Sequence, residues 1–142
     1  MLLGEHEHAL DDKNRLTLPA RLRAELGREV VVSRGLDGCL YVYAAEAWQR
    51  LAERIGTLDP FDPDARKMRR FFFASAAEAE LDKQGRVVIP ARLLAAAGIG
   101  REVTVAGMDD HLEIWDRAAW RAQQQAVEGS AEDVAERLAN RD

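Results

Sequence analysis

Polar and hydrophobic residues alternate over residues 15–18, and the matching stretch 86–89 begins with an arginine and continues as an apolar run. Successive side chains of a strand point to opposite faces, so this alternation predicts a strand with one buried face. The second stretch is also rich in β-branched residues, which favours a strand further. We therefore predict that Arg15 and Arg86 face outward and that the alternate apolar residues face the core, namely Leu16, Leu18, Val87 and Ile89.

The pattern that follows each of these strands is the same in both places. A proline, Pro19 or Pro90, precedes a short apolar segment that glycine closes at Gly27 or Gly98. Proline suits the first turn of a helix and glycine its end, so each segment should be a short helix. A hairpin should follow each helix, with strands at 30–32 and 40–43 in the first copy and at 101–105 and 112–115 in the second.

Longer helices are predicted between and after these units. Apolar residues spaced as i, i+3, i+4 and i+7 indicate a helix over 45–55. The pair Asp62-Pro63 is typical of a helix start, and that helix should extend to about residue 73. A last helix should run from about residue 120 toward residue 138, interrupted at Gly129-Ser130.

The chain thus contains an internal repeat. Asp11, Arg15 and Pro19 correspond to Asp82, Arg86 and Pro90 at one constant offset. A unit of roughly 45 residues is marginal alone, so two copies should share one core. We predict a mainly β fold with peripheral helices, in which the segments are a first repeat, a helical connection, a second repeat and a C-terminal helix with its tail, at 4–47, 48–76, 77–119 and 120–142.

Composition narrows the possible functions. The formal net charge is −5, which argues against sequence-blind coating of nucleic acid but allows a local basic patch. The single cysteine, Cys39, excludes an intrachain disulfide and a multi-cysteine metal site. The N-terminus lacks a signal-peptide stretch, and the chain has no run of 18 apolar residues. We therefore expect a cytoplasmic protein that does not contact a membrane.

The candidate functional residues lie in the Asp-x-x-x-Arg loop of each repeat, because they are the part of the repeat that the need for a buried core does not explain. An outward guanidinium matches guanine O6 and N7, or a phosphate, and the aspartate can hold it in place. Gly85 suits the tight turn of the second loop, and Asn14 can adopt the same left-handed backbone in the first. The candidate DNA-binding residues are the two pairs with their neighbouring cations: Asp11, Arg15, Asp82, Arg86, Lys13, Lys83, Arg21 and Arg92.

The segment Leu81-Asp82-x-x-Gly85-Arg86-Val87-Val88-Ile89-Pro90 resembles the signature of AbrB/SpoVT-type DNA-binding domains. Two such units in a chain of this length resemble the MraZ family of bacterial transcriptional regulators, although Asn14 stands where that family commonly has glycine. The resemblance implies a double-split β-barrel of swapped hairpins and ring-shaped homo-oligomers. It also implies binding to short G-rich promoter repeats upstream of the division and cell-wall gene cluster, at the nucleoid. Its two Asp-x-x-x-Arg motifs map onto Asp11 with Arg15 and onto Asp82 with Arg86.

Other functions have weaker support in the sequence. His6 and His8 share a strand face but have no third ligand nearby, so we predict no metal site. Phosphate-cradling loops, nucleophile elbows and zinc-protease motifs are absent, so we predict no enzymatic activity, cofactor or small-molecule substrate. The stronger alternative is a ring-forming interaction protein whose arginine loops bind an acidic protein partner. An antitoxin-like role also occurs in the wider fold family, where one unit with a toxin-binding tail is usual.

Overall fold

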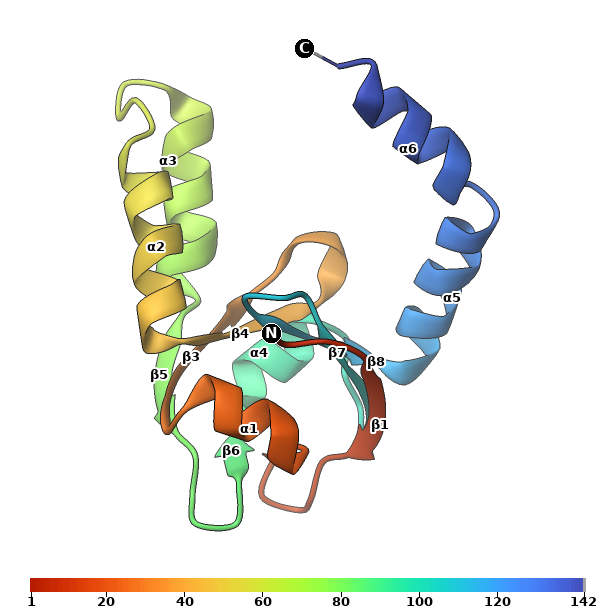
Figure 1. Cartoon of the computed structure of the whole chain (residues 1–142). Coiled ribbons are helices and arrows are strands. Elements are labelled where there is room, and N and C mark those ends of the chain that lie inside the picture. Colours follow the sequence, from red (N-terminus) through yellow and green to blue (C-terminus); the bar gives the residue numbers. More distant parts are fainter. Residues whose placement is uncertain (142) are drawn as a thin grey trace.

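A computed structural model describes residues 1–141, and its fold is built around a β-sheet and a separate two-stranded ribbon (Figure 1). Six strands form one antiparallel sheet in the order β1-β7-β8-β4-β3-β5, while β2 and β6 form a separate ribbon. The predicted hairpins are present, with small shifts at their ends. The strands are β1 Glu5–Ala9, β2 Arg15–Thr17, β3 Glu29–Arg34, β4 Leu40–Ala44, β5 Ala77–Glu80, β6 Arg86–Val88, β7 Glu102–Gly107 and β8 Leu112–Asp116.

Helices lie around this β-structure, and most of them begin where the sequence predicts. The short helices start directly after Pro19 and Pro90, and the side chain of Asp62 caps α3 by accepting a hydrogen bond from the backbone N–H of Asp64. The break at Gly129-Ser130 separates the last two helices, as predicted. The helices are α1 Ala20–Leu26, α2 Ala45–Gly56, α3 Pro63–Arg69, α4 Ala91–Ala96, α5 Arg117–Glu128 and α6 Ala131–Ala139, with a 3₁₀ turn at Leu36–Gly38.

One helix differs from its prediction. The α-helix that was expected to reach about residue 73 ends at Arg69, and the chain continues as a π-helical turn, Arg70–Ala74. The wider turn carries Phe72 into the interior, where its ring stacks on Tyr41 with centroids 6.2 Å apart. The aromatic run therefore packs against the sheet instead of continuing a regular helix.

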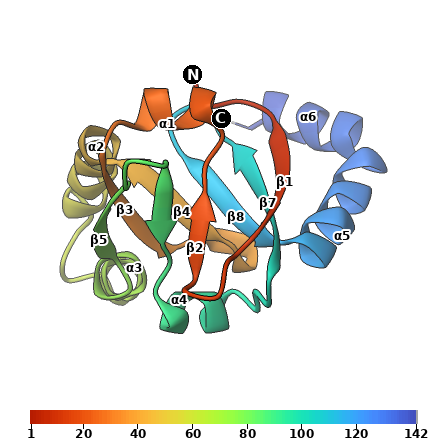
Figure 2. The same ribbon diagram turned by 90° about the horizontal axis from the view of Figure 1, so that it is seen from below.

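The two repeats exchange their first strands. β1 of the first repeat pairs with β7 of the second, and β5 of the second pairs with β3 of the first. The ribbon pairs Leu16 with Val87, which occupy the same position in the two repeats. A pseudo-twofold axis therefore passes through the ribbon, and Figure 2 shows the ribbon lying across the sheet with α1 and α4 at its two ends.

The hydrophobic core lies between the ribbon and the sheet, and both repeats contribute to it. The predicted facing of the ribbon strands is confirmed, because the alternate apolar residues are fully or almost fully buried while Val88 on the other face is 54% exposed. Cys39 is a buried free thiol, and burial raises its pKa to about 12. The buried ribbon residues are Leu16, Leu18, Val87 and Ile89.

The prediction of a β-rich body with peripheral helices is confirmed, but the double-split β-barrel is not. Helices make up 43% and strands 28% of the chain, and the six-stranded sheet is open. In the described part of the chain, β1 and β5 are its two edges, because the ribbon makes its ladder internally and not with them. None of the helices in residues 1–141 combines the length and hydropathy that a membrane crossing requires. Residue 142, the end of the predicted segment 120–142, lies outside the described residues.

Candidate nucleic-acid interface

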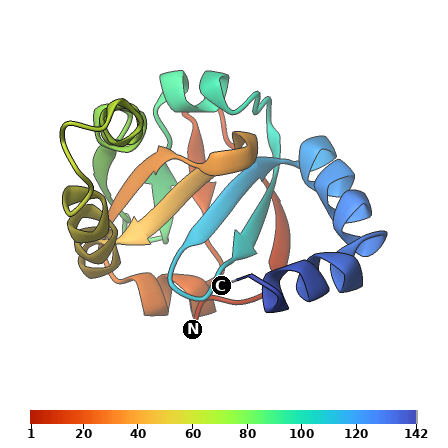
Figure 3. The same ribbon diagram turned by 90° about the horizontal axis from the view of Figure 1, so that it is seen from above.

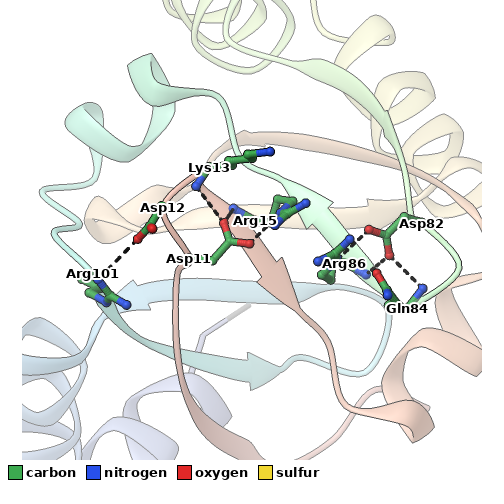
Figure 4. A network of polar contacts seen from close by, with 8 residues as sticks. All are labelled: Asp11, Asp12, Lys13, Arg15, Asp82, Gln84, Arg86 and Arg101. Atoms are coloured by element: carbon green, nitrogen blue, oxygen red, sulfur yellow. Dashed lines mark hydrogen bonds and ion pairs between the residues drawn. The ribbon is translucent and has the colours of Figure 1, made fainter.

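The two Asp-x-x-x-Arg loops lie side by side at the end of the molecule that carries the ribbon. The first loop connects β1 to β2 and the second connects β5 to β6. Because β2 and β6 pair antiparallel around the pseudo-twofold axis, both loops reach the same outer surface (Figures 1 and 4). The pairing of β2 with β6 is therefore what brings two motifs far apart in sequence onto one face.

The carboxylate of Asp11 organises the first loop. Its Oδ1 atom accepts hydrogen bonds from the backbone N–H groups of Lys13 and Arg15, both at 2.9 Å. Its Oδ2 atom accepts from the Arg15 Nε at 2.6 Å. One aspartate thus closes the turn and fixes the direction of the arginine, and the second of these roles is the one predicted from the sequence.

The second loop repeats this arrangement almost atom for atom. Oδ1 of Asp82 accepts from the backbone N–H groups of Gln84 and Arg86 at 2.9 Å, and Oδ2 accepts from the Arg86 Nε at 2.7 Å (Figure 4). The two loops also lock each other, since the Leu18 N–H donates to the Gly85 carbonyl and the Ile89 N–H donates to the Asn14 carbonyl. The paired loops are therefore one unit.

Each clamped arginine keeps the end of its guanidinium group available. The Arg15 side chain is 29% exposed and that of Arg86 is 28% exposed. Within residues 1–141 the Nε atom is the only guanidinium nitrogen of each that makes an intramolecular hydrogen bond, so neither terminal nitrogen has a partner in the chain. Two parallel N–H groups held in a fixed direction are what bidentate recognition of guanine or phosphate requires.

The hydrogen bonds lower the pKa of both aspartates. At Asp11 the backbone N–H of Arg15 is the largest cause, and together with the Arg15 side chain and the Lys13 N–H it lowers the pKa from its ordinary value of 3.8 to about 2, against an opposing effect of desolvation. The backbone N–H of Arg86 lowers the pKa of Asp82 in the same way. Both carboxylates are therefore charged at neutral pH, as the ion pairs need.

The lowered pKa of Asp11 predicts how the loop responds to acid. A depressed pKa means that the carboxylate contributes its full stabilisation above pH 3.8 and loses it as the pH falls through about 2. The amide protons of Lys13 and Arg15 should keep their hydrogen-bonded NMR shifts at pH 4 and lose them as the pH falls through about 2. A titration of the Asp11 carboxyl carbon with a midpoint near 3.8 would contradict the clamp.

Both loops contain a residue in the left-handed region, as predicted. Asn14 has φ 57° and Gly85 has φ 76°, so asparagine meets the requirement that glycine meets in the other copy. The second loop is tighter, because a Cβ on Gly85 would overlap the guanidinium of Arg23. That guanidinium donates from Nη1 to the Gln84 carbonyl at 2.6 Å and braces the second loop from α1.

Substitutions at these two positions should therefore differ in cost. Gly85→Ala adds left-handed strain and displaces Arg23, so it should lower the free energy of unfolding by roughly 1–3 kcal/mol. Asn14→Ala adds only the strain, roughly 1 kcal/mol, and Asn14→Gly should change stability little. Urea denaturation of the three variants measures this order. Equal losses for Gly85→Ala and Asn14→Ala would show that Arg23 does not constrain the loop.

The outer face of the ribbon contains two more side chains, Thr17 and Val88. They alternate with buried neighbours, and the register sets Arg15 opposite Val88 and Thr17 opposite Arg86. The sequence pattern already placed Thr17 outward, but neither residue was identified as functional. A hydroxyl and an exposed isopropyl group between two arginines could contact base edges and thymine methyl groups.

The other predicted cations have different surroundings. Lys13 and Lys83 are exposed on the loops. Arg21 on α1 donates to the Leu3 carbonyl at 3.2 Å, and Arg92 on α4 donates to the Ser75 carbonyl at 2.9 Å. Each of these two arginines therefore also fastens its helix to the segment before an exchanged strand, a structural role that the sequence did not reveal.

Arg23 is a further residue of this site that sequence reasoning missed. Its counterpart in the second repeat is Leu94, which belongs to the core. A search for cations shared by both copies therefore could not find it. Among the described residues no group of three or more His, Cys, Asp or Glu side chains could hold a metal ion, and His6 and His8 on β1 gain no third ligand.

Comparison with known proteins gives a consistent result. A family model described as "MraZ protein, putative antitoxin-like" matches the chain twice, over residues 1–71 and 72–142. The chain is 46% identical over 138 residues to "Transcriptional regulator MraZ" of Heliobacterium modesticaldum, an alignment that covers 97% of this chain and 96% of that protein. It is 41% identical over 140 residues to the protein of the same name in Caldanaerobacter subterraneus subsp. tengcongensis, with 99% and 98% covered.

Both relatives are named transcriptional regulators, so the class of protein is the transcription regulators. The family model finds two units in the chain, and the fold has two repeats that exchange strands. The chain belongs to the MraZ family. The family resemblance seen in the repeated Asp-x-x-x-Arg segment is thereby confirmed.

Proposed function

We propose that this protein is a sequence-specific DNA-binding regulator that reads tandem G-rich promoter repeats with one arginine loop from each repeat of the chain. The observation that carries the proposal is the duplicated clamp, in which an aspartate holds an outward arginine by its Nε atom and leaves the terminal nitrogens open. The relatives' name, transcriptional regulator, supports this function over enzymatic ones.

The geometry suits the major groove of DNA. That groove admits a two-stranded β-ribbon, and an arginine that meets guanine O6 and N7 with two N–H groups is the commonest specific contact. Arg15 and Arg86 lie on the outer face of such a ribbon. Each would contact one guanine, and Thr17 and Val88 between them would contact the intervening base edges.

The cations around the ribbon would supply affinity for DNA, while the two clamped arginines would supply specificity. Lys13 and Lys83 on the loops, with Arg21 and Arg92 on the flanking helices, would contact phosphates and set the orientation of the ribbon on the duplex. The net charge of −5 would weaken attachment to other DNA. The aspartates Asp11 and Asp82 would act through the arginines, by lowering the entropy that these lose on binding.

Assembly would supply the remaining affinity. One chain offers only two arginine contacts, so a ring-shaped homo-oligomer would bind tandem boxes far more tightly than a single chain binds one box. Boxes on one face of the duplex recur after about one helical turn, roughly 10 base pairs. We place these boxes upstream of the division and cell-wall gene cluster, and the protein at the nucleoid in the cytoplasm.

Footprinting on the organism's own promoter region of that cluster tests the proposal. The protein should protect short G-rich repeats at a regular spacing and leave a duplex of scrambled sequence unprotected at the same salt concentration. Its affinity for the promoter should fall as salt rises, because phosphate contacts release counterions. Equal binding to both duplexes, or binding only to an acidic protein partner, would contradict sequence-specific DNA binding and would favour the alternative function, an interaction protein.

A further inference from the structure

The helix after the hairpin of each repeat begins at a corresponding position, Ala45 in α2 and Arg117 in α5. The two helices lie on opposite sides of the sheet, α2 beside the β5 edge and α5 beside the β1 edge (Figures 2 and 3). Because a pseudo-twofold axis relates the repeats, the surroundings of these two residues can be compared directly. The first repeat has alanine where the second has a long cationic side chain.

In the second repeat, Arg117 fills a site between α5 and the strands β1 and β7. Its Nη2 atom donates to the backbone carbonyl of His8 at 2.7 Å and lies 3.4 Å from the carbonyl oxygen of Val103. The carboxylates of Glu7 and Glu102 are 3.7 and 3.5 Å from its Nε and Nη1 atoms. The side chain is only 18% exposed. Two carbonyls and two carboxylates therefore form a guanidinium site that the chain fills itself.

The first repeat has the same four acceptors around a cavity. β5 pairs with β3 in the register in which β1 pairs with β7, so each acceptor has a counterpart. A cavity of about 760 Å³ lies at this place, between α2 and the strands β3 and β5. Its lining includes Ala45 together with the counterparts of the two carbonyl and two carboxylate residues, which are Ala79, Val30, Glu78 and Glu29.

The carboxylates at this cavity lack the arginines of the second repeat. Arg121, a second cation that pairs with the β1 carboxylate at 3.2 Å, corresponds to Gln49. Among residues 1–141, Glu29 and Glu78 take part in no ion pair, whereas the third carboxylate of the lining, Glu80, pairs with an arginine at 3.4 Å. A cation that enters the cavity would therefore meet two carboxylates without a counter-charge.

Aromatic side chains form another part of the cavity wall. Trp48 and Phe73 line it, with ring centroids 6.1 Å apart and an interplanar angle of 73°. The counterpart of Trp48 is Trp120, whose indole N–H donates to Glu5, and the residue that corresponds to Glu5 is Ala76 in the cavity lining. Aromatic faces beside free carboxylates favour a cation over a neutral ligand.

We propose that the cavity between α2, β3 and β5 is a binding site for a guanidinium group from outside the chain. The second repeat identifies the ligand, because its own arginine occupies the equivalent place. A guanidinium has five N–H donors in one plane, so it can meet carbonyls and carboxylates on several sides at once. The group belongs either to a small guanidino compound or to an arginine of another protein, and the two sources are distinguished below.

Agmatine and putrescine test the site by calorimetric titration of the full-length protein. Both are dications with the same carbon chain, and only agmatine has a guanidinium. One agmatine should bind per chain with a dissociation constant below about 1 mM, and putrescine should bind about tenfold more weakly. The absence of saturable agmatine binding, or equal affinities for the two compounds, would overturn the inference.

Variants of the cavity assign the binding to it. Ala45→Arg gives the first repeat the arginine of the second, and Glu29→Gln with Glu78→Gln removes the free carboxylates. Each should weaken agmatine binding by about tenfold or more while the circular dichroism of the protein stays unchanged. The control is Glu46→Gln with Glu53→Gln, which removes two exposed α2 carboxylates outside the cavity and should leave the affinity unchanged. Full agmatine binding by Ala45→Arg would mean that the ligand binds elsewhere.

Arg117→Ala shows whether the probe recognises such a site at all. This variant should melt at a lower temperature than the wild type, because it loses the bonds of a largely buried side chain. Agmatine should restore part of the loss and bind at two sites per chain. If agmatine stabilises this variant but does not bind the wild type, the first-repeat cavity is not a guanidinium site.

A blocked peptide with one arginine identifies the source of the guanidinium. β5 is an edge strand, so the peptide backbone can pair with it while the arginine enters the cavity. A peptide that binds more tightly than agmatine indicates an arginine of a partner protein, and an affinity no higher than that of agmatine indicates a free guanidino compound. Both results support the site. DNA is absent from every measurement, so the outcome is independent of the proposed function.

Discussion

Replacing both Arg15 and Arg86 with alanine is expected to reduce promoter binding to the level of a scrambled duplex. Each guanidinium keeps two open terminal nitrogens on the ribbon face, and a lost bidentate contact with guanine costs roughly 1–3 kcal/mol per site engaged. Since 1.4 kcal/mol is tenfold in affinity, one replacement should weaken binding to a single box by about 5- to 150-fold. The double replacement removes every specific arginine contact, and assembly then multiplies the loss.

Titration of a labelled promoter duplex at two salt concentrations measures this effect. Arg50→Ala is the matched control, because it removes the same charge from an exposed position on α2, away from the ribbon. The control should keep wild-type discrimination between promoter and scrambled duplex. Unchanged affinity of the double variant would show that the clamped arginines do not read DNA.

The local parts of this site could be predicted from the sequence. The loop conformation depends on near neighbours, since Asp11 bonds the backbone of residues two and four positions ahead. The left-handed backbone at Asn14 followed from its correspondence to Gly85. The outward direction of Arg15 and Arg86 followed from the alternation of the strand. In each case short-range sterics and hydrogen bonds decide the structure.

The long-range parts could not be predicted from the residues alone. Nothing in β1 specifies pairing with β7 instead of a strand of its own repeat, because the backbone ladder is the same in either case. The Arg23 brace joins α1 to the carbonyl of Gln84, far away in the sequence, and occurs in only one repeat. The bonds of Arg21 and Arg92 to backbone carbonyls depend on the same exchange, because each lies beside a strand that has crossed over.

Replacing Leu16 with alanine is expected to lower the free energy of unfolding by about 2–5 kcal/mol. Leu16 is fully buried and faces Val87 on the pseudo-twofold axis. Domains of this size have a total stability of only about 5–15 kcal/mol, so the loss would be a large share. Because β1, β2 and β4 all pair with strands of the second repeat, the damage should spread across the whole chain.

Loss of stability in the second repeat can be measured separately, because Trp48 lies in the first half of the chain and the other tryptophans lie in the second. In a Trp48→Phe background the remaining fluorescence comes from Trp115 and Trp120 in the second half. Leu16→Ala in the first half should shift that signal and the far-ultraviolet circular dichroism to the same lower denaturant midpoint. Val88→Ala, an exposed position on the same ribbon, should change stability by no more than about 0.5 kcal/mol. If the second-half signal kept its midpoint, the two repeats would unfold separately, and the pairing of β2 with β6 could not be holding both loops on one face.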